Sequence, residues 1–281
     1  MRKYIVILTI GILALGVCSC RRGKENPEEV KYNMREDVVF TASASGYLTK
    51  ASDSALEDGD AIGIFALEPI NAYNVKGTVT GSKVSTDYRV KWELNQTKPT
   101  RFAAYLPYNA NLGAIDYSFS VQTDQSTYAA YQASDLRYAV VDARPGNAVD
   151  LKFQHALSKL VVVMEVPDIE VQSVVAEDVV TGLRLNLVDG NVEPEALLKG
   201  QVTFGKAVEA NGGTGYTAIM VPQNGSIGLK VTLKEGLVID AKPETATSLE
   251  PGIAYKATVG LTGTFILSVT DWADDGEIPI K

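Results

Sequence analysis

Residues 151–164 read Leu-Lys-Phe-Gln-His-Ala-Leu-Ser-Lys-Leu-Val-Val-Val-Met, and this stretch indicates the fold class. Its apolar side chains occupy odd positions up to Leu157 and even positions from Leu160 onward, the alternation of a half-buried strand that changes face. An extra residue in a strand causes such a change, so a β-bulge or sharp bend is predicted near Ser158. A helix also fits the spacing, but the three consecutive valines favour a strand. His155 falls on the apolar face, where a packed structural histidine is expected.

Similar short segments recur along most of the chain. They are rich in Val, Ile, Thr, Tyr and Phe, are separated by Gly, Asn, Asp and Pro, and show little helical periodicity. Segment 110–133 is polar and tyrosine-bearing, and is expected to form long loops or a short helix. Many short strands at regular spacing are typical of sandwiches and barrels, so the chain is predicted to be all-β. The other expected strands are 38–42, 61–65, 88–94, 101–105, 216–221, 227–233, 253–261 and 265–272.

A linker is predicted near the middle of the chain. Residues 142–147 read Asp-Ala-Arg-Pro-Gly-Asn and carry the Pro-Gly pair typical of a turn or linker. A length of 281 residues suits two domains of ordinary size. We therefore expect one β-sandwich domain over residues 37–147 and a second over residues 148–281.

The composition restricts the possible functions. The chain is 46% hydrophobic and 21% charged, which suits a folded protein with a buried core. Two cysteines cannot form a disulfide framework, and with one histidine they cannot supply a metal cluster. The net charge of −8 argues against nucleic-acid binding. The sequence contains no nucleophile elbow, phosphate-binding loop or zinc-protease motif, so no catalytic residue, metal or cofactor is predicted.

The N-terminus carries an export signal. A basic start, Met1-Arg2-Lys3, precedes an apolar run that is shorter than the roughly 20 residues of a membrane-spanning helix. Residues 1–19 are therefore predicted to be a signal peptide. The sequence Val-Cys-Ser-Cys at 17–20 resembles the lipobox of bacterial lipoproteins, which implies that Cys20 is diacylated and begins the mature chain. Residues 20–36 are expected to be a flexible tether.

Two alternatives to acylation at Cys20 stay open. The signal could be cut before Cys18, although valine fits poorly next to that cut. It could also be an ordinary signal peptide that leaves Cys20 as a free thiol, which would be unusual in an oxidising compartment. Two or more acyl chains would anchor the protein stably to a membrane, whereas one would hold it only marginally.

Eight short motifs between residues 38 and 275 occur in a recognisable order. One reads Phe-Ala-Ala-Tyr-Leu-Pro-Tyr at 102–108, and another reads Val-Thr-Asp-Trp at 269–272. The others are at 39–43, 56–65, 134–139, 149–160, 221–223 and 249–255. In this order they resemble the fimbrillin family, in particular the Mfa-like fimbrillin lipoproteins of anaerobic Gram-negative bacteria. Each motif is short, and the specificity comes from their order over nearly the whole mature chain.

The resemblance implies two transthyretin-like β-sandwich domains in tandem. It also implies a structural or accessory component of cell-surface fimbriae (pili) that supports adhesion, exported as a surface-exposed lipoprotein of the outer membrane. Other fimbrial subunits would be its partners, through addition of a β-strand from one subunit to the next. In polymerising fimbrillins a trypsin-like protease cuts after an arginine and removes the first strand, which opens the groove that accepts this strand.

Candidate residues for this assembly are carried over from the resemblance. Arg35 is the candidate cleavage site, although it precedes the first expected strand, and an uncleaved surface arginine is the competing interpretation. The acidic residues at 271–277 leave little spare tail for self-polymerisation. The candidate strand-exchange residues are Val38, Val39 and Phe40 near the N-terminus, and Phe265, Leu267 and Val269 near the C-terminus.

Two other functions are weighed against the fimbrial one. A surface glycan-binding lipoprotein outside any pilus predicts exposed aromatic side chains on one face, with Tyr117, Tyr128 and Tyr131 as candidates. The alternative interpretation is that these tyrosine rings pack against the sandwich and bind no ligand. A hydrolase predicts a concave pocket that holds carboxyl groups of shifted pKa. We expect no enzymatic activity.

Overall fold

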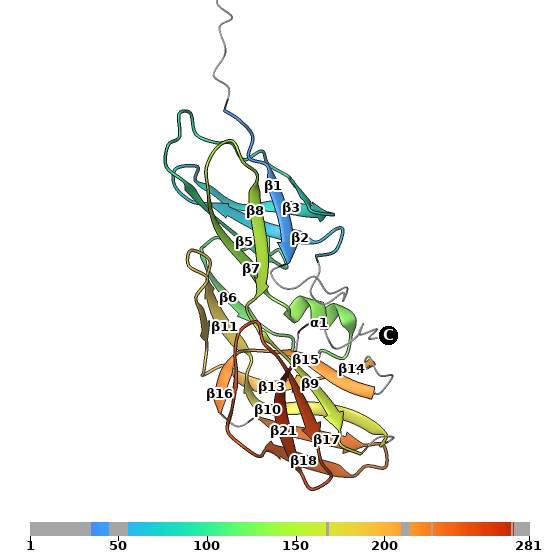
Figure 1. The fold of residues 1–281 in the computed structure, drawn as a ribbon. Helices are drawn as coiled ribbons and strands as arrows, with labels where there is room; N and C mark the ends of the chain where they lie inside the picture. The colour runs from blue at the N-terminus through green and yellow to red at the C-terminus, as the bar shows by residue number, and fades with distance from the viewer. Residues whose placement is uncertain are drawn as a thin grey trace, which may run out of the picture. The chain divides into compact units, whose positions relative to one another are not determined.

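The computed structural model describes most of the chain beyond residue 34 (Figure 1). From Arg35 onward the chain belongs to one compact unit. The described part forms 21 β-strands and one short helix, α1 (Tyr128–Ser134), which confirms the predicted all-β class. The described residues are 35–44, 56–166, 169–208, 214–225, 227–270 and 272.

Seven strands close into a barrel, which is coloured mostly blue to green in Figure 1. The first and last strands of the barrel pair in parallel, from Phe40 opposite Val149 to Ala44 opposite Phe153. This pairing joins the two ends of the sheet, so closure depends on the first strand. In order around the wall the strands are β1 (Phe40–Ala44), β4 (Lys83–Thr86), β3 (Ala72–Thr80), β2 (Ala61–Ala66), β5 (Thr100–Leu106), β7 (Arg137–Ala143) and β8 (Val149–His155).

The other strands form three open sheets. The largest has nine strands, in the order β13 (Lys199–Thr203), β10 (Val171–Val180), β17 (Gly228–Leu233), β18 (Val238–Pro243), β21 (Thr264–Thr270), β20 (Ala254–Val259), β9 (Ser158–Met164), β15 (Thr214–Met220) and β14 (Gly205–Val208). The second contains β12 (Val192–Pro194), β11 (Gly182–Asn186) and β6 (Asp116–Ser120), and the third contains β16 (Gln223–Gly225) and β19 (Thr247–Leu249).

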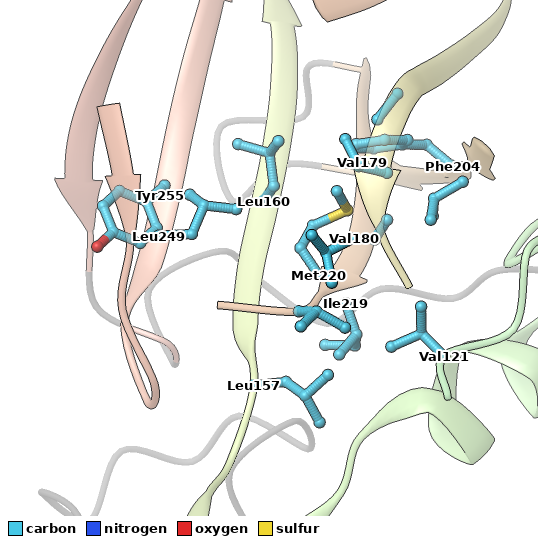
Figure 2. Packing of buried hydrophobic residues seen from close by; sticks show 14 of the residues in the cluster. Val121, Leu157, Leu160, Val179, Val180, Phe204, Ile219, Met220, Leu249 and Tyr255 are labelled. Carbon is cyan, nitrogen blue, oxygen red and sulfur yellow. The ribbon is translucent and has the colours of Figure 1, made fainter. Parts of the chain in front are cut away.

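Two hydrophobic cores share strand β5. Phe102 and Ala104 face the core inside the barrel, while Ala103 and Tyr105 belong to a second core that the open sheets enclose. The residues of β5 are therefore apolar in succession, as expected for a strand that is buried on both faces. Figure 2 shows part of the second core, where side chains of β9, β10 and β15 converge.

The stretch 151–164 changes face where the chain leaves the barrel. β8 ends at His155, residues 156–157 form a bend, and β9 begins at Ser158 in the nine-stranded sheet. Leu157 and Leu160 then both belong to the second core (Figure 2). The bend expected near Ser158 is thus a crossing between two sheets, and beyond it residues 158–162 are buried in succession rather than at even positions only.

The strand expected at 88–94 is wrong. Val90 and Trp92 are buried, as the alternation predicted, but the segment forms only an isolated bridge. Two backbone hydrogen bonds hold it against residues 36–38, from Val38 N to Val90 O and from Trp92 N to Glu36 O. Alternation at 88–94 therefore produced burial at two positions without a strand.

The predicted division into two domains stays a prediction, and the strand pairing changes where we would place it. Pro145-Gly146, expected to be a linker, forms the turn between β7 and β8 of the barrel, where Gly146 takes a φ of +95°. β6 precedes residue 147 but pairs with β11 beyond it. We propose the crossing at residues 156–157, where the barrel ends, as the division, with β6 belonging to the second part although it precedes the crossing. The count of two transthyretin-like sandwiches also stays a prediction.

Candidate functional site

The first candidate segment leads into strand β1, which begins at Phe40 and closes the barrel wall. β1 pairs with β8 along its length and with β4 at Phe40 and Thr41. Val38 and Phe40 point inward, with 8% and 3% of their surface exposed, while Val39 is 60% exposed. The structure therefore places the three residues as alternating inward and outward positions on the chain that seals the barrel.

The side chains beneath β1 form an aromatic cluster. Phe40 meets Phe102 edge-on, with ring centroids 5.6 Å apart. Trp92 meets the same Phe102 ring at 5.6 Å from another direction. Removing β1 would expose these rings to water, which costs free energy in proportion to the apolar area uncovered. The barrel without β1 would thus hold a hydrophobic groove.

Arg35, the candidate cleavage site, lies five residues before β1 begins. Its side chain is 49% exposed and forms an ion pair with Glu93 at 3.0 Å. A protease could reach such a side chain, but a cut there leaves β1 in the barrel. Cleavage at Arg35 stays a prediction.

Cys20 and the signal peptide lie outside the described residues. Within the described ranges, no helix combines the length and the hydrophobicity that crossing a membrane requires. Acylation of Cys20 stays a prediction that rests on the sequence.

Strand β21 contains the second candidate segment and has one open side. β20 pairs with it from Phe265 to Thr270. β18 meets it on the other side only at Thr264 and Phe265, and one further backbone hydrogen bond, from Glu244 N to Phe265 O at 3.0 Å, follows the end of β18 at Pro243. Among the described strands, no other pairs with residues 266–270 on that side. This stretch therefore offers backbone groups to an additional strand.

The face of β21 that carries the candidate side chains becomes exposed along the strand. Phe265, Leu267 and Val269 alternate and so share one face. Phe265 is 2% exposed, Leu267 is partly buried and Val269 is 70% exposed. The hydrophobic core behind β21 thus opens toward the end of the strand. An open edge beside a partly uncovered apolar face is the geometry that strand addition requires.

A buried charge cluster, which the sequence analysis did not predict, lies where β7 begins and β8 ends. The Asp135 carboxylate accepts a hydrogen bond from Arg137 Nε at 2.6 Å and lies 2.7 Å from His155 Nδ1. The three side chains are between 6% and 12% exposed. Burial alone would raise the pKa of the Asp135 carboxyl, but Arg137 and His155 hold that pKa well below its usual value. His155 is a packed structural residue, as expected.

The same histidine holds the end of β21 through Trp272. The two rings stack with centroids 3.7 Å apart and planes 17° apart. The backbone oxygen of Trp272 accepts a hydrogen bond at 3.3 Å from Lys159, whose side chain is buried at the start of β9. Trp272 packs against the second core. The cluster therefore connects barrel strands to the C-terminal strand.

The tyrosines expected for a glycan site and the carboxyl groups expected for a hydrolase do not form these sites. Tyr117 and Tyr131 are 6% and 3% exposed and belong to the second core, so they present no ring to a glycan. Tyr128 is partly buried and donates a hydrogen bond to Glu57 at 3.2 Å. A pocket of about 360 Å³ beside α1 includes Asp135. The pKa of the Asp135 carboxyl is lowered, however, whereas a general acid needs a raised pKa to keep its proton.

Comparison with known proteins identifies one family. A family model described as fimbrillin-like matches residues 49–272, which is most of the chain. No curated protein matches the chain in sequence.

Solved structures share the fold at low sequence identity. A candidate cell adhesion protein of Bacteroides uniformis superposes with a TM-score of 0.65 at 18% identity, covering 84% of this chain and 99% of that one. A second from Bacteroides ovatus has a TM-score of 0.66 at 15% identity, covering 85% and 97%. A third from Bacteroides thetaiotaomicron has a TM-score of 0.52 at 17% identity, covering 80% and 93%. The likeness supports the arrangement of strands described above.

Proposed function

We propose that this chain, which belongs to the fimbrillin-like family, is a structural or accessory subunit of cell-surface fimbriae. The observation that carries the proposal is the open edge of β21 beside a partly uncovered apolar face. Soluble proteins rarely leave a strand edge and apolar side chains together without a partner. Its role is then to hold other subunits through backbone and packing contacts rather than to catalyse a reaction.

Assembly proceeds by strand addition at β21. A strand from another subunit pairs with residues 266–270 and covers Leu267 and Val269. The contact joins the edge of β21 on one subunit to the added strand of the other, so the two subunits contribute different surfaces. Such a heterologous contact does not close on itself and extends a filament.

The N-terminal strand stays with its own subunit. The sequence has no arginine between β1 and β2, and the next arginine after Arg35 is Arg89. Arg89 lies between β4 and β5 and forms an ion pair with Asp37 at 3.2 Å. A cut after Arg89 would therefore separate barrel strands from one another. An arginine-specific protease can therefore remove the tether at Arg35 but cannot release β1 alone.

Export occurs as a lipoprotein with Cys20 as the lipid-bearing residue. The support is the Val-Cys-Ser-Cys sequence after a basic and then apolar start. Acyl chains at Cys20 would hold the precursor at the outer membrane, with the tether separating the lipid from the folded unit.

Immunogold electron microscopy tests the fimbrial role. Antibodies raised against the exported protein are applied to intact cells that make it, and cells lacking it serve as the control. The proposal predicts gold particles on surface filaments, along them or at one end. Labelling of the cell surface with filaments left bare would overturn it.

A further inference from the structure

Two exposed tyrosines of the barrel line one hollow. Tyr73 and Tyr88 are 59% and 69% exposed, more than any other tyrosine in the described ranges. Both line a hollow of about 440 Å³ beside the start of β3. Exposing large aromatic rings to water costs free energy. Two such rings around one hollow therefore indicate a binding surface.

A third ring completes the hollow, and two of the rings have a packing partner. Tyr108 lines the hollow, and Lys76 Nζ lies 5.8 Å from its ring centroid. The Tyr73 ring meets the buried Phe65 edge-on, with centroids 6.4 Å apart. Rings held in this way lose little conformational freedom when a ligand binds, which favours affinity.

Polar side chains of several kinds stand at the rim. The carboxamide of Asn71 is held by a hydrogen bond from its Nδ2 to Pro69 O at 3.2 Å. The backbone of Asp87 is bonded to Lys76 O at 3.0 Å, which places a carboxylate and an ammonium group on the same rim. Asn71 Oδ1 accepts a hydrogen bond from the Tyr73 hydroxyl at 3.5 Å, which ties the carboxamide to that ring, and the exposed Asp87 carboxylate can accept hydrogen bonds from a ligand.

The hollow continues into a longer groove. A second hollow of about 330 Å³ shares Asn71, Ala72 and Tyr88 with the first and extends to Arg35 and Lys91. The combined groove is longer than a single small ring would fill, so it suits a ligand with several linked units.

We propose that this groove binds an oligosaccharide, with its sugar rings on Tyr73, Tyr88 and Tyr108. A sugar ring presents C–H groups on one face and hydroxyl groups around its edge. Tyrosine faces match the first, and carboxamide, carboxylate and ammonium groups match the second. A nucleic-acid strand would also stack on tyrosines but meets a chain of net charge −8. The groove is separate from β21, so binding does not depend on filament assembly.

Glycan-array binding followed by saturation-transfer NMR tests this inference. The purified exported protein is applied to an array of neutral and acidic oligosaccharides, and the strongest binder is titrated. Tyr88→Ala and Tyr73→Ala should each weaken its binding about tenfold or more. Leu237→Ala removes an exposed apolar side chain elsewhere and should leave binding unchanged. Both tyrosines are exposed, so these variants should fold like the parent, as circular dichroism checks.

Three results would overturn the inference. The first is an array on which no oligosaccharide binds. The second is oligosaccharide binding that both tyrosine variants retain in full. The third is binding of a proline-rich peptide panel, in place of the sugars, that the tyrosine variants abolish, since such peptides also dock on aromatic grooves. None of these results bears on the filament role, which the immunogold experiment tests separately.

Discussion

Asp135 joins an arginine and a histidine side chain at one buried point. Its carboxylate contacts Arg137 on β7 and His155 on β8, and His155 in turn stacks on Trp272 beyond β21. Charges in such surroundings are stable only while their partners remain, because burial removes the water that would otherwise solvate them. The cluster therefore fixes the C-terminal strand to the end of the barrel.

Asp135→Asn should destabilise the protein by about 3 kcal/mol, because the buried Arg137 and His155 would lose their carboxylate. Urea unfolding measures the change. The matched control is Asp142→Asn, which removes the exposed ion pair with Arg101 at 2.8 Å and should cost less than about 1 kcal/mol. Equal losses in the two variants would contradict the role given to burial.

The pH dependence of stability gives a second test of Asp135. Its carboxyl has a lowered pKa in the folded protein, so below about pH 4 the unfolded chain binds a proton that the folded one does not. The stability that Asp135 contributes is thus present at neutral pH and declines as the pH falls through that range. The difference in unfolding free energy between the parent and Asp135→Asn should therefore stay constant above about pH 5, begin to shrink below about pH 4, and keep shrinking as the pH falls further toward the lowered pKa. A difference that stays constant below about pH 4 would count against the lowered pKa.

Sequence reasoning reached these residues only in part. The apolar face of 151–164 correctly predicted a packed His155. Asp135 and Arg137 lie within a family motif, but their partner follows 20 residues later on another strand. Period-2 alternation describes one strand at a time and carries no information on which side chains meet between strands. The charge cluster could therefore be found only in the folded chain.

The existence of strands was predictable, whereas their pairing was not. Alternation and turn residues located β2, β5 and β20 to within a few residues. The same signal at 88–94 produced two buried side chains without a strand, because alternation reports burial and not the hydrogen-bonding partner. The open edge of β21 likewise depends on where β18 ends in space. The candidate side chains of β21 were named from sequence, but the vacant edge beside them was not.

Val269→Lys should block strand addition at β21. The side chain is 70% exposed, so the subunit itself should keep its stability within about 0.5 kcal/mol. An added strand would bury the new ammonium group against apolar atoms, which costs enough to reduce incorporation into filaments about tenfold or more. Immunoblots of purified filaments measure incorporation.

Leu197→Lys is the matched control for that experiment. Leu197 is 98% exposed and lies outside the strands, so the new charge stays in water. Filaments that incorporate both variants as well as the parent would show that β21 is not the contact.

At the scale of the whole molecule, the described residues belong to one compact unit. The unit from Arg35 onward contains a closed barrel and an open-edged sheet. A closed barrel resists strand exchange because its edges are already paired, whereas the open sheet invites it. We therefore propose β21 of the open sheet as a contact for assembly and the groove on the barrel as the site for a ligand.

Cys20→Ala should abolish incorporation of radiolabelled palmitate and retention of the precursor in the membrane fraction, because the variant has no thiol at which acyl chains attach. Cys18→Ala is the matched control and should leave both unchanged. Labelling that survives in Cys20→Ala but not in Cys18→Ala would move the lipid to the other cysteine.

N-terminal sequencing of the chain recovered from purified surface filaments tests the central claim most directly. The account predicts that the chain is present and begins before β1, at Cys20 if the precursor is uncut or at Glu36 if Arg35 is cleaved. A blocked terminus would indicate acylated Cys20, which mass spectrometry of the first peptide identifies. A chain that begins beyond Ala44, or that is absent from the filaments, would contradict the account.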